Sequence, residues 1–282
     1  MDDAALAIRK IDVTKVRLFV PPNLKKFKFD LFHRVAMHIK KLGGDAIYYD
    51  YSVIGKLSDE LIPIVGCTPE FRGFIENWQQ RKRQWIYWDR GYLRRVFATW
   101  LPRGSDMGLP GGYYRWHRNM PQMQEVYDVP DDRWKYLDLE RHQFPRPWNK
   151  KGSHVIIADT LPDYWNLFSD PHWTKRTVHE LKKYTDRKII VRDKESKIPL
   201  ERDLKDAHCL VAHGSIAAVE SVMFGCPVFV APMSAAALMG KTDLSEIEKP
   251  IYPERMKWLY SLAYCQFNEK ELIDGTLWRL LR

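Results

Sequence analysis

The chain has 282 residues, 45% of them hydrophobic and 29% charged, which is typical of a soluble globular protein with two compact α/β halves or one large domain. It has no run of about 18 apolar residues, which excludes a membrane-spanning helix, and its N-terminus MDDAALAIRK lacks the order of a signal peptide. We therefore expect a cytoplasmic protein, whose formal net charge of +9 indicates a polyanionic partner or a solvated basic surface.

The first elements of the chain form a predicted β-α-β unit. We expect a strand at 16–20, a helix at 29–42 that ends before Gly43-Gly44, and a second strand at 46–49. The loop after the first strand reads PPNLKKFKFD and has no G-x-G-x-x-G pattern. A dinucleotide is therefore not expected there.

Asp89 follows the next clear strand, at 84–88, which carries the sequence WIYW. A carboxylate at a strand end, facing a cleft between two halves, is placed to take a proton from an acceptor hydroxyl. The alternative is a structural ion pair with Arg90 or Arg94. Two less distinct elements precede this strand: a strand at 62–65 and a helix at 71–80.

Regular periodicity fails over 102–148, which is rich in Gly, Pro, Arg and aromatic residues. We interpret it as an ordered acceptor-side insertion that leads into an interdomain linker, with Arg115, His117 and Arg118 as candidate polyanion contacts. Aromatic residues also interleave with the basic clusters of the first half: Trp78, Trp85, Trp88, Tyr92, Trp100, Tyr113, Tyr114 and Trp116. This pattern suits nucleic acid or a sugar acceptor, and the alternative is a solvated basic surface with its Trp residues in the core.

Three predicted strands of the second half end in polar residues. These strands, at 154–158, 188–191 and 209–212, are followed by Asp159-Thr160, by Arg192 and Lys194, and by His213-Gly214-Ser215. Because the carboxyl ends of parallel strands meet at one edge of a sheet, we expect these residues to converge there. We expect helices at 173–184 and 256–264, and a further one capped by Asn268 and Glu271.

The stretch 209–232, CLVAHGSIAAVESVMFGCPVFVAP, predicts a strand, a tight turn, a helix at 216–224 and a strand at 227–231. A helix that begins near Ser215 points its first N–H groups at the sheet edge, where a phosphate binds favourably. Glu220 stands inside this apolar helix, and a ribose hydroxyl pair is a fitting partner for its carboxylate. The alternative is an ordinary α/β turn with a solvated Glu.

The string H-G-S-x-A-A-x-E-S-x-x-x-G-x-P-V-F-V, which begins at His213, resembles the donor-site signature of GT-B glycosyltransferases, especially the capsule-polysaccharide-synthesis type. The resemblance implies that His213, Gly214 and Ser215 hold the diphosphate of a nucleotide sugar and that Glu220 holds its ribose. Thr160, Arg192 and Lys194, at the converging strand ends, are further predicted donor-site residues, and Arg192 and Lys194 are placed there to neutralise a leaving diphosphate. The resemblance implies that this charge is stabilised without a metal. The expected donor is a UDP-sugar, and no other cofactor is expected.

The segment Asp89-Arg90-Gly91-Tyr92 fits a D-x-G-Y pattern that resembles the phage relatives of the same group. The resemblance is specific over 188–278 and looser around Asp89, and between about 96 and 150 nothing matches. It implies two Rossmann-like domains, 1–150 on the acceptor side and 151–282 on the donor side, with C-terminal helices that cross back.

The favoured acceptor is a 5-hydroxymethylpyrimidine such as 5-hydroxymethylcytosine in phage-type DNA, because the chain is basic and Arg- and Trp-rich. The location would then be the host cytoplasm. Asp89 is the predicted general base, and the predicted DNA contacts are Arg90, Tyr92, Arg94, Arg95, Arg115, His117 and Arg118. One alternative acceptor is a capsule or cell-surface polysaccharide. A second alternative is a non-catalytic nucleic-acid-binding protein on the same scaffold.

The four cysteines, Cys67, Cys209, Cys226 and Cys265, are far apart in the sequence. This spacing favours reduced thiols over disulfides or a zinc site, and no structural metal is expected.

Overall fold

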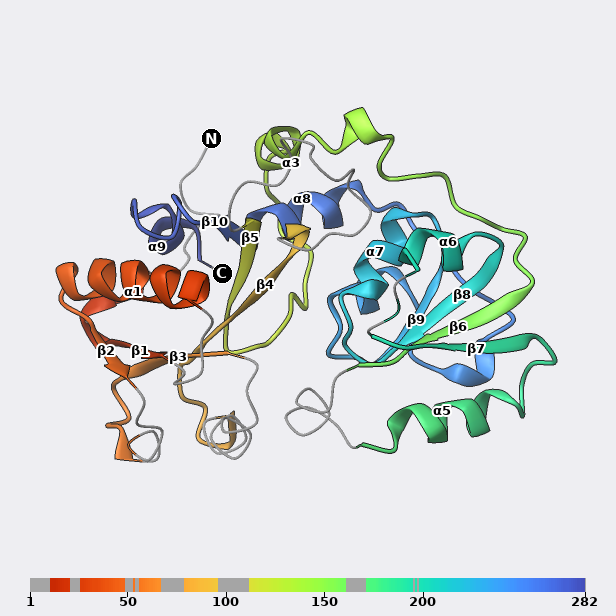
Figure 1. Cartoon of the computed structure of the whole chain (residues 1–282), viewed down its shortest axis with the longest axis horizontal. Helices are drawn as coiled ribbons and strands as arrows, with labels where there is room; N and C mark the ends of the chain where they lie inside the picture. The colour runs from red at the N-terminus through yellow and green to blue at the C-terminus, as the bar shows by residue number, and fades with distance from the viewer. Residues whose placement is uncertain are drawn as a thin grey trace.

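A computed structural model of the protein describes residues 11–20, 26–48, 53, 56–66, 79–95, 112–160, 171–194, 196 and 198–281. The described chain is built around two β-sheets that lie side by side, with helices packed on both (Figure 1). Parallel strands dominate both sheets, which fits the Rossmann-like, GT-B-like architecture expected from the sequence.

The first sheet has six strands in the order β10-β5-β4-β3-β1-β2. Its parallel part consists of β1 (Val16–Val20), β2 (Asp45–Tyr48), β3 (Ile62–Val65) and the start of β4 (Ile86–Arg95). The first three strands confirm the sequence prediction to within one residue. The predicted helix at 71–80 lies almost wholly outside the described residues.

Helix α1 (Lys26–Lys41) packs on this sheet through apolar residues spaced by four. Leu31, Val35 and Ile39 share a buried cluster with Leu18 of β1, whereas Lys40 on the opposite face is exposed. This is the pattern of an amphipathic helix with one face on a core. Gly43, with a φ of 89°, then ends the helix at the predicted place.

Strands β4 and β5 (Gly112–Arg118) form a long antiparallel pair that the sequence reading did not predict. Asp89 therefore lies inside a strand rather than at its end, opposite Arg115. The parallel pairing of β4 with β3 stops at Tyr87, so Asp89 still lies two residues beyond the carboxyl end of the parallel part. Strand β5 was not predicted because Arg115 and His117 are polar although both are buried, so the sequence does not alternate between apolar and polar residues there.

The second sheet is fully parallel, in the order β7-β6-β8-β9. Its strands match the predicted ones within two residues: β6 (His154–Ala158), β7 (Lys188–Arg192), β8 (Ala207–Ala212) and β9 (Val228–Val230). Short helical segments surround it and the connection that precedes it: α3 (Asp132–Leu137), η5 (Glu140–His142), α5 (Trp173–Leu181), α6 (Leu200–Leu204), α7 (Ala217–Met223), η6 (Ala235–Met239) and η7 (Leu244–Glu246).

The C-terminal segment returns to the first sheet (Figure 1). After α8 (Met256–Tyr264), β10 (Gln266–Asn268) pairs antiparallel with β5, and α9 (Thr276–Leu280) follows. The predicted start of a helix at Asn268 is wrong, because 269–273 form turns and α9 begins only at Thr276. The predicted capping contacts do form: Asn268 N donates to Glu271 at 2.9 Å, and Glu271 N donates to Asn268 at 3.0 Å.

Within the described part of the chain, no helix combines enough length with enough apolar character to cross a bilayer. Cys209, Cys226 and Cys265 are buried, and no disulfide joins the described cysteines; Cys67 lies outside the described residues.

Candidate functional site

The carboxyl edge of the second sheet borders a cavity of about 230 Å³. Residues from the ends of β6 and β7 line it together with the start of α7, and Arg90 of β4 reaches it from the first sheet. The lining is strongly polar: Arg90, Asp159, Arg192, Asp193, Lys194, Ser196, Ser215 and Glu220, with Ala158, Leu200 and Ala217. Five residues predicted from sequence to bind donor or acceptor therefore meet in one place: Arg90, Arg192, Lys194, Ser215 and Glu220.

Glu220 is the most deeply buried charged residue of this lining, with 3% of its surface exposed. It lies in α7 among apolar neighbours that include Val219 and Val222. Burial lowers the pKa of Arg192, and the nearby Glu220 carboxylate acts in the opposite direction. The two predicted donor residues therefore interact electrostatically across the cavity.

Arg192 is also tied to the protein itself. Its guanidinium pairs with Asp203 and donates to the carbonyl of Ile198 at 2.6 Å. These contacts fix the orientation of the side chain at the cavity wall. Arg192 therefore has both a structural role and a surface that faces the cavity.

The turn 213–215 lies between β8 and α7 as predicted, but its three residues make different contacts. Helix α7 begins at Ala217, and the Ser215 hydroxyl accepts from its N–H at 3.3 Å, so Ser215 starts the helix and also lines the cavity. His213 packs edge-on against Trp173, with ring centroids 5.7 Å apart. Gly214 uses its carbonyl to accept a bond from Gln122. Neither His213 nor Gly214 lines the cavity.

Asp159 and Thr160 follow β6 at the same edge. The Asp159 carboxylate accepts from the Thr160 N–H and from the Thr174 hydroxyl, both at 2.8 Å. Asp159 lines the cavity, whereas Thr160 does not. The backbone N–H of Thr160 therefore helps to orient the Asp159 carboxylate.

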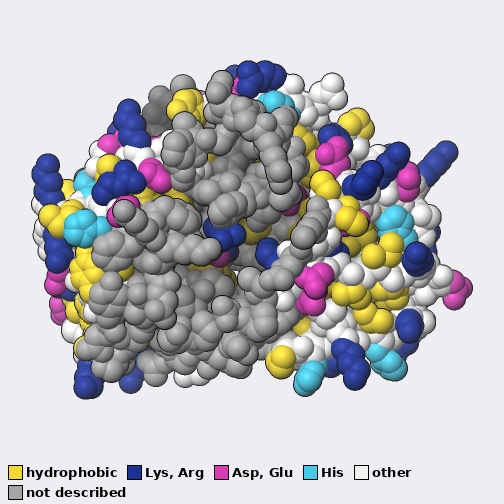
Figure 2. Space-filling model, in the orientation of Figure 1, with side chains coloured by type: hydrophobic (Ala, Val, Ile, Leu, Met, Phe, Trp, Pro, Cys, Tyr) yellow, Lys and Arg dark blue, Asp and Glu magenta, His cyan; other side chains and the backbone are white. Residues whose placement is uncertain are grey.

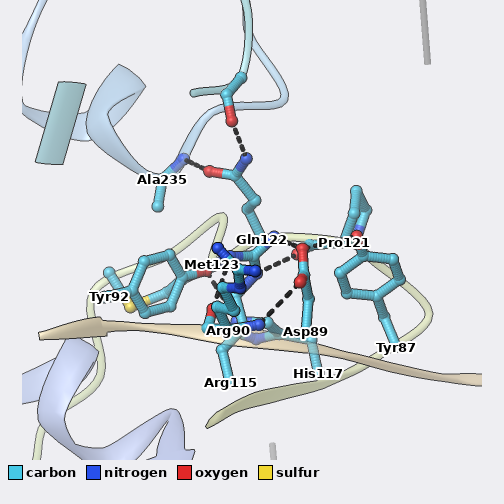
Figure 3. A network of polar contacts seen from close by, with 11 residues as sticks. Tyr87, Asp89, Arg90, Tyr92, Arg115, His117, Pro121, Gln122, Met123 and Ala235 are labelled. Atoms are coloured by element: carbon cyan, nitrogen blue, oxygen red, sulfur yellow. Dashed lines mark hydrogen bonds and ion pairs between the residues drawn. The ribbon is translucent and has the colours of Figure 1, made fainter. Parts of the chain in front are cut away.

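Asp89 lies in a network centred on Arg115 (Figure 3). Arg115 donates to the Asp89 carboxylate at 2.7 Å, and the Tyr87 hydroxyl donates to the same oxygen at 3.1 Å. The Asp89 side chain keeps 28% of its surface exposed, whereas that of Arg115 keeps 5%. Asp89 thus forms a structural ion pair, the alternative considered from the sequence, with Arg115 as its partner, and the side chain of Arg94 lies outside the described residues.

Three of the predicted DNA contacts, Tyr92, Arg115 and His117, are buried. The Tyr92 hydroxyl lies 2.7 Å from His117 Nε2 and accepts from the Met123 N–H at 2.8 Å. Burial, followed by the charge of Arg115, lowers the pKa of His117 to about 3. These side chains hold the interior together and have no surface for a polyanion.

The four other predicted DNA contacts are arginines that lie in different surroundings. Arg90 is exposed and lines the cavity, Arg118 is half-buried at the far end of β5, and the side chains of Arg94 and Arg95 lie outside the described part. Gly91 has no room for a side chain, because a Cβ there would lie 2.7 Å from the carbonyl oxygen of Tyr113.

Most of the aromatic residues proposed as stacking surfaces belong to the core. Trp85, Trp88, Tyr92, Tyr113 and Trp116 are each at most 5% exposed. Trp88 and Trp116 stack on each other with centroids 4.7 Å apart. Trp78 and Trp100 lie outside the described residues. On the face drawn in Figure 2, the described Lys and Arg side chains are scattered, mostly around the outline and among acidic ones.

Two buried glutamines form hydrogen bonds that were not predicted from the sequence. Gln266 accepts from the N–H groups of Tyr92 and Leu93 at 2.9 and 2.8 Å, where the β4–β5 pairing shifts register. Gln122 lies in a loop of the first half and forms hydrogen bonds with the backbone of Gly214 and Ala235 in the second half. Nothing in the string MPQMQE distinguishes Gln122, since only its burial shows its role.

Among the described residues, no group of three or more His, Cys, Asp or Glu side chains is arranged to hold a metal ion.

No protein-family model matches the chain, and a search of curated proteins finds no related sequence. Several solved structures match it, and two of them are Kdo transferases that match over nearly their whole length. The KpsC β-Kdo 2,7-transferase of Thermosulfurimonas dismutans has a TM-score of 0.53 and 8% identity, over 93% of this chain and 99% of that chain. The KpsC β-Kdo 2,4-transferase of the same organism has a TM-score of 0.50 and 13% identity, over 90% and 92%.

The chain has the fold of these two Kdo transferases. At 8% and 13% identity this likeness shows a shared fold alone.

Proposed function

We propose that the protein is a glycosyltransferase that moves a sugar from a nucleotide-sugar donor to a hydroxyl group of a saccharide acceptor, as in capsule or cell-surface polysaccharide synthesis. The observation that carries this proposal is the polar cavity at the carboxyl edge of the second sheet, lined by Ser215, Glu220, Arg192 and Lys194. Ligands of α/β proteins bind at this edge. The fold shared with two Kdo transferases supports the same reaction class.

In this proposal the donor nucleotide lies against α7. Glu220 accepts hydrogen bonds from the ribose hydroxyls, which offset the cost of burying its carboxylate. Lys194 and Arg192 stabilise the negative charge that grows on the departing phosphate. Arg90 adds a third cation from the first sheet, and we assign it to the donor rather than to DNA. A UDP-sugar as the donor, and transfer without a metal, remain proposals.

Asp89 is the proposed general base for the acceptor hydroxyl. It lies in the same strand as Arg90, which reaches the donor cavity, and part of its carboxylate faces solvent. Arg115 and Tyr87 hold this carboxylate in one orientation, so its contribution rests on position.

A saccharide acceptor is favoured over DNA by the burial of the predicted DNA contacts. Tyr92, Arg115 and His117 are unavailable, and the described aromatic residues of the basic clusters are mostly in the core. Neither of the two Kdo transferases is named as a DNA-modifying enzyme.

Hydroxymethylated DNA stays as a second candidate because the chain carries a net charge of +9. If DNA is the acceptor, its affinity falls steeply with salt, with a log–log slope of about −0.9 for each phosphate contact. A third candidate, a non-catalytic binding protein, requires Asp89 to be buried in an ion pair. Asp89 is paired but partly exposed, which favours an enzyme.

The experiment that tests the proposal offers both acceptors to the protein. It is incubated with a panel of nucleotide sugars and either a polysaccharide primer or hydroxymethylated DNA, and the mass of each acceptor is measured. A sugar added to the saccharide supports the proposal. A sugar added only to digested nucleosides replaces the saccharide with DNA, and an unchanged mass of both acceptors with every donor rejects transferase activity.

A further inference from the structure

A short segment between β5 and α3 connects the two halves of the molecule. We name residues 121–124, with the sequence Pro-Gln-Met-Gln, the strap. Met123 is fully buried, and its N–H donates to the Tyr92 hydroxyl in the interior of the first half. Gln124 is exposed, and its amide donates to the carbonyl of Met233 in the second half at 2.8 Å.

Gln122 makes the innermost contacts of the strap, and 1% of its surface is exposed. Its amide nitrogen donates to the carbonyl of Gly214 at 2.6 Å, and its amide oxygen accepts from the N–H of Ala235 at 2.9 Å. Figure 3 shows the side chain extended from the strap toward these two backbone groups. In a buried site each such bond holds its partner firmly, because an unpaired amide or carbonyl there is costly.

The other end of the strap is attached to the Asp89 network. Arg115 donates from Nε to the carbonyl of Pro121 at 3.2 Å, and the same guanidinium holds Asp89 at 2.7 Å. Pro121 and Gln122 are adjacent. A continuous chain of hydrogen bonds, joined by the peptide bond between Pro121 and Gln122, therefore runs from the Asp89 carboxylate through Arg115 and the strap to Gly214, the residue before Ser215.

We propose that Gln122 is a positioning residue that sets the donor turn 213–215 relative to Asp89, and so controls binding of the nucleotide part of the donor. Gln122 does not line the donor cavity, so it acts through Gly214, whose neighbour Ser215 does. A displaced Gly214 carbonyl moves Ser215 and the N–H groups that follow it. This inference rests on the proposed donor site and adds the residue from the other half that shapes it.

Two substitutions and one matched control test this role. Gln122→Glu keeps the shape of the side chain and the oxygen that accepts from the Ala235 N–H. It replaces the amide nitrogen with a second oxygen, which faces the Gly214 carbonyl oxygen and cannot donate to it. Gln122→Met keeps the approximate volume and removes both bonds. Gln124→Met alters the same strap at an exposed position away from the cavity. Thermal unfolding first establishes that each variant is folded.

The probe is whichever nucleoside mono- or diphosphate, from a panel, the unaltered protein binds most tightly by calorimetry. Both Gln122 variants are expected to weaken its binding about 10-fold, the scale of losing one buried hydrogen bond, and Gln124→Met by less than about twofold. In a transfer assay the KM for the donor rises while kcat at saturating donor changes less. Unchanged nucleotide affinity in folded Gln122 variants overturns the proposal.

Amide hydrogen exchange on the unaltered protein gives a second test that needs no variant to fold. Nucleotide binding is expected to slow exchange both at 213–217 and in the strap, which the cavity does not touch. Slower exchange at 213–217 with an unchanged strap contradicts the coupling.

Exchange also separates this inference from the donor-site proposal. If no nucleotide binds, the donor site is wrong, but faster exchange at 213–217 in ligand-free Gln122→Met still shows that the strap positions the turn. Unchanged exchange there rejects the positioning role itself.

Discussion

Arg115 and Asp89 form an ion pair across the β4–β5 ladder, with Nη2 of the arginine 2.7 Å from Oδ2 of the aspartate. The same guanidinium donates to the carbonyls of Arg90 and Pro121. It also lies over the rings of Tyr87 and Tyr92, 5.5 Å from each centroid. A residue expected at a nucleic-acid surface is therefore the buried support of the proposed base.

Replacing Asp89 with Asn tests that base. The amide keeps the size of the side chain but cannot accept a proton, so the transfer rate is expected to fall about 10²–10⁴-fold. Nucleotide binding is expected to stay unchanged, because Asp89 does not line the donor cavity. Asp138→Asn is the control, since Asp138 forms an exposed pair with Arg141. Transfer by Asp89→Asn near the unaltered rate would assign the base elsewhere, with Asp159 next to be replaced.

Replacing Arg115 with Gln separates a structural role from a DNA contact. Three hydrogen bonds are lost and Asp89 loses its cation, so we expect the free energy of unfolding to fall by roughly 3 kcal/mol. Urea denaturation measures this loss. Arg141→Gln, at an exposed pair, should change it by less than about 0.5 kcal/mol. A variant as stable as the unaltered protein but with weaker DNA binding would restore the surface role.

Arg90 and Arg118 form a matched pair of arginines in the β4–β5 hairpin. Arg90 lines the donor cavity, whereas Arg118 lies opposite Ile86 at the other end of the ladder and does not. Arg90→Ala is expected to weaken nucleotide binding about 10-fold through loss of a charge-assisted contact, and Arg118→Ala less than twofold. Calorimetry compares them, and equal effects would remove Arg90 from the donor site.

His117 gives the fold a specific sensitivity to acid. Its pKa is lowered to about 3 from 6.5, chiefly by burial, so the folded state keeps the ring neutral. As the pH falls below about 6.5, the unfolded chain binds a proton that the folded chain does not, and stability falls by about 1.4 kcal/mol per pH unit. Urea denaturation at about pH 7 and pH 5 should show a pH dependence about 2 kcal/mol smaller in His117→Gln. An equal dependence in both proteins would show that His117 titrates normally.

The second sheet and the donor edge were predictable from sequence because their signals are local. Buried parallel strands are continuous apolar runs, and the turn before α7 combines small residues with Glu220 in the next few positions. The predicted convergence of Arg192, Lys194 and Ser215 is found in the cavity.

The acceptor side was predicted poorly because its contacts are long-range. Arg115 lies 26 residues from Asp89, and Gln122 lies 92 residues from Gly214. A buried arginine and an exposed one look alike in a sequence, and so do two glutamines in one loop. The pairing of β5 with β4 places Arg115 beside Asp89, and the burial of Gln122 shows that it is the glutamine that turns inward.

The most direct test of the proposed glycosyltransferase is whether sugar transfer depends on Glu220. Mass spectrometry follows a polysaccharide primer incubated with the panel of nucleotide sugars and either the unaltered protein or Glu220→Gln. We expect the mass of the primer to rise by one sugar with the unaltered protein. We also expect slower gain with Glu220→Gln at low donor, through a loss of roughly 1–3 kcal/mol in donor binding, and recovery at saturating donor. No mass gain with any donor, or equal rates for both proteins at low donor, would contradict the proposed function.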